Sequence, residues 1–188
     1  MLLNIWKLVL FLLIIIASPS CCKIFGKKYI ITDQQLLIAK NPSKYKYKNA
    51  SKNESSNPLK FNGIYVREFH GNINFKDSVG IVYMRLFNSG HVFIGELRDE
   101  IPQSIELNSL NNGFGGYYKI EKGLIKIEYF IERDCGTRML NFGIIQNNSI
   151  NMYTANPKTF FGQIPANSKT VIWKFIQFDH LEHPEIIW

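Results

Sequence analysis

The sequence contains few of the residues that bind metals or carry redox chemistry. Among its 188 residues there are only three cysteines, Cys21, Cys22 and Cys135, and four histidines. Adjacent cysteines rarely pair with each other because their side chains diverge. The Cys21–Cys22 pair also lacks neighbouring Cys or His residues at metal-ligand spacing. We therefore expect neither a cofactor nor a metal.

A net positive charge is absent from most of the chain. Residues Lys23 to Lys60 hold nine lysines and two acids, which gives 9 − 2 = +7. Residues from Phe61 onward hold twelve basic and thirteen acidic side chains, which gives 12 − 13 = −1. A domain near neutrality lacks the electrostatic footprint of a nucleic-acid-binding protein, and we find no nucleic-acid motif in it. We therefore expect no nucleic-acid partner.

The first twenty residues have the layout of a secretory signal peptide. Lys7 supplies a positive charge, residues 8–17 (LVLFLLIIIA) form an unbroken apolar run, and small residues with a proline follow. Ten apolar residues at about 1.5 Å each span only half of a roughly 30 Å hydrocarbon core. A permanent transmembrane helix is therefore the weaker interpretation, and residues 1–20 are interpreted as a signal peptide.

This start resembles a bacterial lipoprotein signal. In that family the peptidase cuts before a cysteine that follows small residues, and the new amino-terminal cysteine carries lipid. Cys21, preceded by Ser20, fits this pattern better than Cys22, although Ser18 stands where Leu is commonest. The resemblance implies an acyl chain on Cys21 and attachment to a membrane of the bacterial cell envelope, facing the periplasm or the exterior. Ordinary secretion and an uncleaved anchor are the alternatives, and a disulfide between Cys22 and Cys135 also stays open.

Residues 21–60 are expected to form the lipidated cysteine and a basic tether. The stretch from Lys40 to Lys60 (KNPSKYKYKNASKNESSNPLK) cannot bury enough apolar surface to offset the entropy of ordering it. Upstream, residues 28–40 (KYIITDQQLLIAK) favour one short helix, with a strand as the alternative. Three lysines near the anchor would attract anionic head groups or simply be solvated: Lys23, Lys27 and Lys28.

From residue 61 to residue 188 the hydrophobic pattern has a period of two. In GLIKIEYFIE, the side chains of Ile125, Ile127 and Tyr129 share one face, as in a half-buried strand. Similar short runs recur as FNGIYVREF, VGIVYMRLF, HVFIGEL, GGYYKI, RMLNFGII, SINMYT and TVIWKFIQF. Turn residues separate these runs and no helical pattern intervenes. The pattern predicts an all-β domain, an antiparallel up-and-down meander that closes into a barrel of about eight strands, with a sandwich as the alternative.

The opening of this domain, Phe61-Asn62-Gly63-Ile64-Tyr65, resembles the G-x-W start of lipocalin-like (calycin) domains, with Tyr in place of Trp. The match is short, and it implies the barrel fold more than any ligand.

The inward side chains of such a barrel either fill the interior or line a cavity for one small ligand. Bulky apolar residues at nearly every inward position favour a packed core, with a ligand cavity at the barrel mouth as the alternative. The expected inward set is Ile64, Val66, Val82, Met84, Leu86, Val92, Ile94, Ile125, Ile127, Tyr129, Leu140, Phe142, Ile144, Ile150, Met152, Val171, Trp173 and Phe175. The candidate ligand-lining residues among them are Tyr129, Phe142, Met152 and Trp173.

Residues that fit catalysis are scarce. Cys135 in ERDCGTR has basic neighbours that could activate a thiol, but Asp-Cys-Gly between two strands is first a turn sequence. The tail DHLEHPE places His180 and His183 three residues apart, which is only a weak metal pattern, while His91 follows a turn and is expected to face solvent.

Two further motifs have ordinary structural explanations. The glycines of NNGFGGYY resemble a dinucleotide loop, but no strand and helix of a βαβ unit flank them, so we expect a loop or a bulge entering a strand. Glu96, Asp99 and Glu100 fit either a carboxylate pair or an exposed loop.

Together these features predict a lipid-anchored, non-catalytic binding or interaction module of the cell envelope. Its partners would be the membrane, through the acyl anchor, and either a small apolar ligand or another envelope protein. One alternative is a small envelope hydrolase that uses Cys135 or a histidine. The other is an envelope protein that binds or inhibits another protein.

Overall fold

The computed structural model describes residues 26–48, 59–69, 80–97, 107–121, 123–153 and 170–182. The expected signal peptide, the acyl site at Cys21 and much of the expected tether lie outside the described residues. Within the described ranges, no helix has the length and apolarity needed to cross a bilayer.

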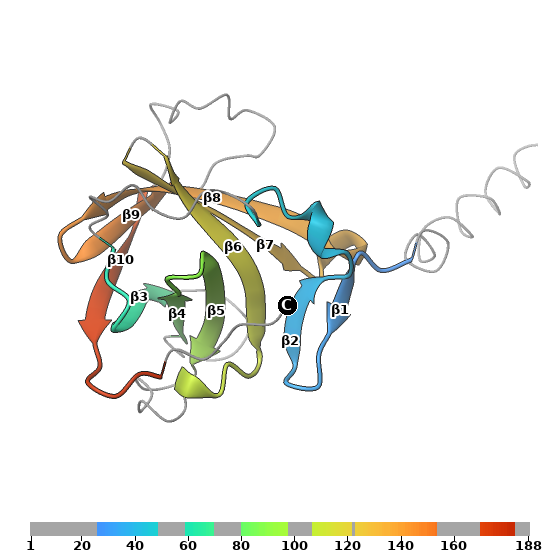
Figure 1. The fold of residues 1–188 in the computed structure, drawn as a ribbon, viewed down its shortest axis with the longest axis horizontal. Coiled ribbons are helices and arrows are strands. Elements are labelled where there is room, and N and C mark those ends of the chain that lie inside the picture. The colour runs from blue at the N-terminus through green and yellow to red at the C-terminus, as the bar shows by residue number, and fades with distance from the viewer. Residues whose placement is uncertain are drawn as a thin grey trace, which may run out of the picture.

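In the described ranges, ten strands form one sheet (Figure 1). They are β1 (Tyr29–Ile31), β2 (Leu36–Ala39), β3 (Gly63–Phe69), β4 (Gly80–Leu86), β5 (His91–Leu97), β6 (Gly113–Glu121), β7 (Leu124–Ile131), β8 (Thr137–Gln146), β9 (Ser149–Tyr153) and β10 (Thr170–Gln177). Two 3-10 turns, η1 (Pro42–Lys44) and η2 (Arg133–Cys135), complete the described elements.

Strands β3 to β10 close into an antiparallel barrel. Each strand pairs with the next along the chain, and β10 pairs back with β3. Removing the β1–β2 hairpin from the ten strands leaves 10 − 2 = 8 barrel strands. The predicted eight-stranded meander and its closure are therefore confirmed, and the fold is consistent with a lipocalin-like barrel.

Three turns within the described ranges lie at the turn residues that separate the apolar runs of the sequence. Gly90 and Gly123 adopt φ values of 87° and 75°, which L side chains rarely reach, in the β4–β5 and β6–β7 turns. Asn147 and Asn148 separate β8 from β9. Every apolar run that was predicted to be a strand forms one.

The expected helix over residues 28–40 is wrong, because these residues form the β1–β2 hairpin. Gln35 has a positive φ of 58°, and the hydroxyl of Thr32 accepts a hydrogen bond from the N–H of Leu36 at 3.2 Å. All four residues of β2 are buried, and β2 pairs in parallel with the start of β6. Because both faces of this short strand are buried, its sequence does not alternate between apolar and polar residues. Pairing with distant strands therefore outweighed the helix preference of the local sequence.

The barrel interior is filled by one cluster of buried side chains. Its buried members are Leu59, Tyr65, Met84, Leu86, Val92, Ile94, Tyr118, Ile125, Ile127, Ile150, Met152 and Trp173. Tyr65, the residue in the Trp position of the lipocalin-like start, is only 2% exposed, and its hydroxyl accepts a hydrogen bond from the N–H of Lys60.

In two strands, β3 and β8, the side chains predicted to point into the barrel point outward. In β3, Tyr65 belongs to the interior cluster, whereas Ile64 and Val66 pack in a second cluster on the outer wall. In β8, Ile145 packs against the interior, so its neighbour Ile144 faces outward and is 37% exposed. Both strands carry large apolar residues on both faces, so their sequence does not define which face is inside.

By the same alternation Leu140 lies on the outer face of β8, where it packs against a third cluster. This third cluster joins the hairpin to the outer faces of β6 and β7. Its buried members are Tyr29, Leu37, Ala39, Tyr45, Tyr47, Tyr117 and Phe130. The hydroxyl of Tyr45 donates to the carbonyl of Gly115 at 2.9 Å and accepts from the N–H of Ala39 at 3.0 Å.

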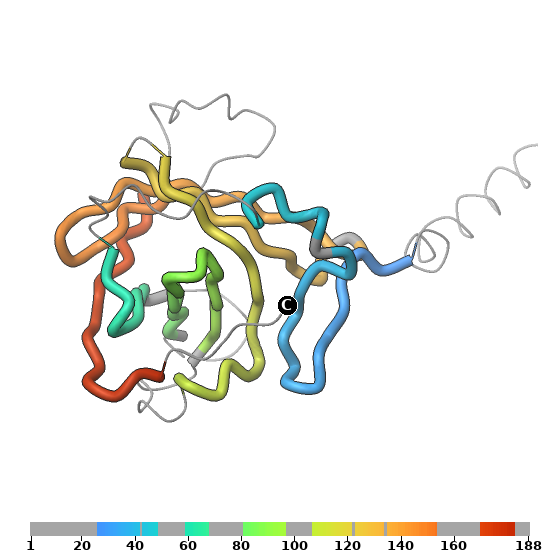
Figure 2. Tube along the Cα trace, in the orientation of Figure 1, coloured from blue at the N-terminus to red at the C-terminus, as the bar shows by residue number. Residues whose placement is uncertain are grey.

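Residues 40–48, which their composition assigned to the tether, are thus held on the barrel by the buried rings of Tyr45 and Tyr47. In Figure 2 the blue hairpin lies against one side of the barrel, away from the red strand β10.

Candidate binding site at the barrel mouth

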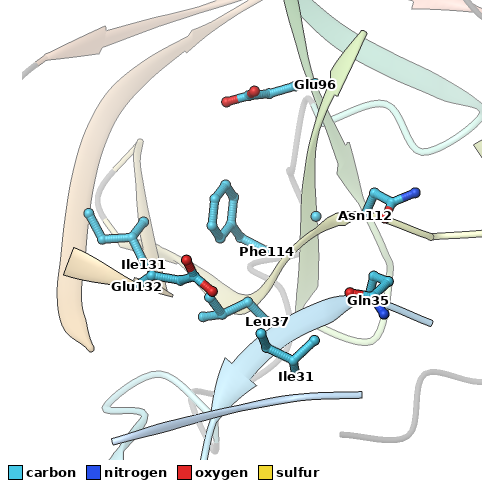
Figure 3. Close-up of a pocket in the computed structure, with 9 residues that line it drawn as sticks. Ile31, Gln35, Leu37, Glu96, Asn112, Phe114, Ile131 and Glu132 are labelled. Atoms are coloured by element: carbon cyan, nitrogen blue, oxygen red, sulfur yellow. The ribbon is translucent and has the colours of Figure 1, made fainter. Parts of the chain in front are cut away.

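A cavity of about 330 Å³ lies between the β1–β2 hairpin and one end of the barrel (Figure 3). Its lining residues are Ile31, Gln35, Leu37, Glu96, Asn112, Gly113, Phe114, Ile131 and Glu132. These residues come from β1, β2, the end of β5, the start of β6 and the end of β7. The volume is at the small end of the range typical of ligand pockets.

The floor of the cavity is apolar and continuous with the barrel interior. The ring of Phe114 lies at its centre in Figure 3, and the same ring packs against the interior cluster. The ring centroids of Phe114 and Tyr129 are 6.0 Å apart. A ligand that rests on Phe114 would therefore contact the wall of the packed core.

Two carboxylates stand beside this floor. Glu96 and Glu132 are both exposed, and in Figure 3 they lie on opposite sides of Phe114. Glu96 is two residues beyond the inward-facing Ile94 in β5, so it projects toward the barrel mouth. The described residues that line the cavity include no basic side chain. The cavity therefore favours a cationic group over an anionic one.

The polar groups of Arg67 and Tyr129 lie on the interior face of the barrel. The guanidinium carbon of Arg67 lies 5.0 Å from the ring centroid of Trp173, which is a cation–π arrangement. The hydroxyl of Tyr129 accepts a hydrogen bond from the side-chain amide of Asn141 at 3.3 Å. Burial raises the pKa of Tyr129, so this hydroxyl stays protonated at neutral pH.

The structure brings together three of the four predicted ligand-lining residues. Tyr129, Met152 and Trp173 all belong to the interior cluster. Phe142 is buried but pairs with Lys126 in β7 and Tyr153 in β9, on the opposite face of β8 from the interior, so it cannot line the same space. Whether the other three contact a ligand stays a prediction.

Most residues of the cavity were missed from the sequence. Phe114 belongs to the glycine-rich NNGFGG, which was predicted to be a loop or a bulge entering a strand. In the structure Phe114 lies at the start of β6. Glu96 was noted with Asp99 and Glu100, which lie outside the described residues. Nothing in the sequence pairs Glu96 with Glu132, because only barrel closure and the hairpin place them around one space.

Cys135 ends the 3-10 turn between β7 and β8, as its sequence predicted. It has a positive φ of 64° and is disulfide-bonded to a cysteine outside the described residues. The Cys135 sulfur is therefore not a free thiol in this structure. The hydrolase alternative would need the bond to be reduced, or a histidine in place of Cys135.

The histidines do not assemble a site within the described ranges. Nδ1 of His91 lies 2.8 Å from the hydroxyl of Ser89, and its ring packs 4.7 Å from that of Tyr117. His180 is exposed, and His70 and His183 lie outside the described residues. Across the parts of the chain that the structure describes, no three His, Cys, Asp or Glu side chains are grouped as metal ligands.

Comparisons with known proteins found no matching family model, no matching curated protein and no matching solved structure.

Proposed function

We propose that this protein is a non-catalytic binding protein that takes a small apolar cation at the mouth of its barrel. The observation that carries the proposal is the cavity of about 330 Å³ with an apolar floor and two glutamates at its sides. An ammonium group attracted by the negative charges of Glu96 and Glu132, with an apolar body on Phe114, satisfies both features. A rigid barrel supplies the fixed walls that such a site needs.

Phenethylamine is a suitable probe because it joins one ammonium group to one aromatic ring. Phenethyl alcohol, which has the same ring without the charge, is the matched control ligand. We expect isothermal titration to show binding of the amine at least tenfold tighter than of the alcohol. The substitutions Glu96→Gln and Glu132→Gln should each remove most of this difference, whereas Asp179→Asn, an exposed acid in the carboxy-terminal segment, should not.

Equal binding of amine and alcohol, or binding of neither, would contradict the proposal. Chemical shifts of Phe114 in an NMR titration would locate the ligand independently of affinity. A response confined to other residues would place the ligand elsewhere.

We further propose that the chain is anchored to the bacterial cell envelope by acylation of Cys21. Because the chain holds only three cysteines, the disulfide of Cys135 requires Cys21 or Cys22. Acylation of Cys21 and pairing of Cys22 with Cys135 use all three residues without conflict. A disulfide also fits an extracytoplasmic, oxidising compartment.

The two cysteines form a matched pair for testing the anchor. Cys21→Ser should move the protein from the membrane to the soluble fraction and remove the acyl mass. Cys22→Ser should leave the protein on the membrane and free the thiol of Cys135. An unchanged membrane fraction and mass in Cys21→Ser would contradict acylation at that residue.

Binding of another envelope protein is the second candidate, and the outer face of the barrel favours it. Ile144 and Ile172 are 37% and 54% exposed and lie on either side of Asn151 in register. Ile172→Lys should then abolish a complex recovered with the tagged full chain. Recovery of the same complex with this variant would exclude that face.

A further inference from the structure

The basic charge of the amino-terminal region lies on a folded surface rather than on a free coil. Residues 26–48 contain six lysines and one acid, Asp33, which gives 6 − 1 = +5. All six lysine side chains are exposed: Lys27, Lys28, Lys40, Lys44, Lys46 and Lys48. We refer to these six residues as the lysine surface.

Buried contacts fix the backbone that carries the lysine surface. The carboxylate of Glu128 accepts hydrogen bonds from the N–H groups of Lys46 and Tyr47, at 2.6 Å and 3.2 Å. The N–H of Lys28 donates to the carbonyl of Cys135 at 2.9 Å, and the N–H of Lys40 donates to the carbonyl of Lys28. The lysines are therefore displayed at fixed positions around the hairpin and the β7–β8 turn.

Apolar and basic side chains adjoin the lysine surface. Ile30 of β1 is 43% exposed, whereas its neighbour Ile31 points to the opposite face of the strand and lines the cavity. Arg133 in the β7–β8 turn is also exposed. An exposed isoleucine among basic groups suits the boundary between lipid head groups and acyl chains.

The lysine surface also begins close to the proposed anchor. Five peptide steps separate Cys21 from Gly26, the first described residue, and a fully extended chain covers at most about 3.6 Å per residue, or about 18 Å. The folded surface therefore starts within about 18 Å of an acyl chain on Cys21.

We propose that the lysine surface, with Ile30, contacts an anionic lipid surface and orients the barrel on the membrane. This inference rests on the proposed anchor for its distance from the bilayer, but not on ligand binding. It places the cavity beside the membrane, because Glu132 lies in the same connection between β7 and β8 as Cys135. A lysine at an anionic membrane contributes about fivefold in binding.

Acetylation of lysines on the full chain, measured by mass spectrometry at low extent of reaction, tests this orientation. The protein would be reconstituted in phosphatidylcholine vesicles with or without phosphatidylglycerol. We expect Lys40, Lys44 and Lys46 to react at least fivefold more slowly when phosphatidylglycerol is present. Lys174, exposed on β10 at the other side of the barrel, is the internal control and should change less than twofold.

High salt should restore the reactivity of the lysine surface, since the attraction is electrostatic. Equal reactivity in the two kinds of vesicle would overturn the proposal. Equal protection by a short single-stranded DNA in neutral vesicles would also overturn it, because the surface would then bind polyanions in general. Failure of the anchor alone is distinguishable, because the parent protein and Cys21→Ser would then float with neutral vesicles to the same extent.

Discussion

The carboxylate of Glu128 in β7 accepts a hydrogen bond from the backbone N–H of Lys46 at 2.6 Å, across 82 residues of sequence. Glu128 is fully buried and also lies 3.3 Å from Nη1 of Arg138. The contact holds the segment after β2 on the barrel wall. This buried acid therefore acts together with the buried rings of Tyr45 and Tyr47 to hold part of a polar, lysine-rich stretch on the barrel.

Removing the Glu128 acceptor should destabilise the protein. In Glu128→Ala the N–H groups of Lys46 and Tyr47 lose their partner, which should lower the free energy of unfolding by about 1–3 kcal/mol. Glu128→Gln keeps an acceptor oxygen and should cost less. Urea unfolding of the two variants measures the difference, and equal losses would show that the acceptor is not the cause.

The same residue should give stability a distinct pH dependence. Burial raises the pKa of Glu128 above its ordinary value of 4.5, so the folded state keeps the proton to higher pH than the unfolded chain. The free energy of unfolding should therefore fall as pH rises from 4.5 through the raised pKa. In Glu128→Gln this fall should be absent.

Glu121 serves as a control with the opposite sign. Hydrogen bonds from Lys119 and Lys126 lower the pKa of Glu121 to about 2. Its contribution is present above pH 4.5 and is lost as pH falls toward about 2. Glu121→Gln should therefore leave the pH dependence of the free energy of unfolding above pH 4.5 unchanged, and a changed dependence there would contradict the assignment to Glu128.

Arg85 should hold the carboxy-terminal segment on the outer wall of β4. The side chain is fully buried; Nη1 donates to the carbonyl of Leu107 at 2.8 Å and Nη2 donates to the carbonyl of Glu182. Arg85→Met should cost about 1.5–3 kcal/mol in the free energy of unfolding and speed amide exchange at Phe178. Lys174→Met, an exposed change of the same kind, should do neither. Unchanged exchange in Arg85→Met would mean that other contacts hold the segment.

Gly116 in β6 should not tolerate a side chain. A Cβ atom there would collide with the carbonyl oxygen of Glu128, and a backbone atom cannot retreat without breaking the β6–β7 pairing. Gly116→Ala should cost about 1–3 kcal/mol in thermal or urea unfolding. Gly123→Asn is the matched control, because Gly123 has open space around it and Asn tolerates its positive φ. Similar stability of the two variants would contradict the crowding at Gly116.

The disulfide of Cys135 should contribute to stability. Loss of a disulfide typically costs about 2–4 kcal/mol, so Cys135→Ser should unfold at a lower urea concentration. A reducing agent should destabilise the parent protein by the same amount and leave Cys135→Ser unaffected. Insensitivity of the parent protein to reduction would contradict a stabilising bond. Mapping of free thiols in the oxidised protein would identify whether Cys21 or Cys22 is the partner.

The candidate site was only partly accessible to prediction. Tyr129, Met152 and Trp173 were placed inside correctly. Each of their strands has a polar residue on the outer face that fixes the alternation: Lys126 in β7, Asn151 in β9 and Lys174 in β10. Phe142 was placed on the wrong face, because β8 has apolar residues on both sides. Phe114 and Glu132 were not identified, since their partners in the cavity lie in distant segments.

The sequence by itself determined the eight barrel strands and the turns that were predicted between them, because period-two alternation and turn residues are local properties of the chain. Only the tertiary structure decided that residues 29–47 pack on the barrel, which face of β3 and β8 is inside, and that Glu96 and Glu132 line the same cavity. The physical reason is that these outcomes depend on burial against distant partners. Parallel pairing of β2 with β6 and the buried acceptor at Glu128 stabilise a segment whose apolar side chains are buried only against the barrel.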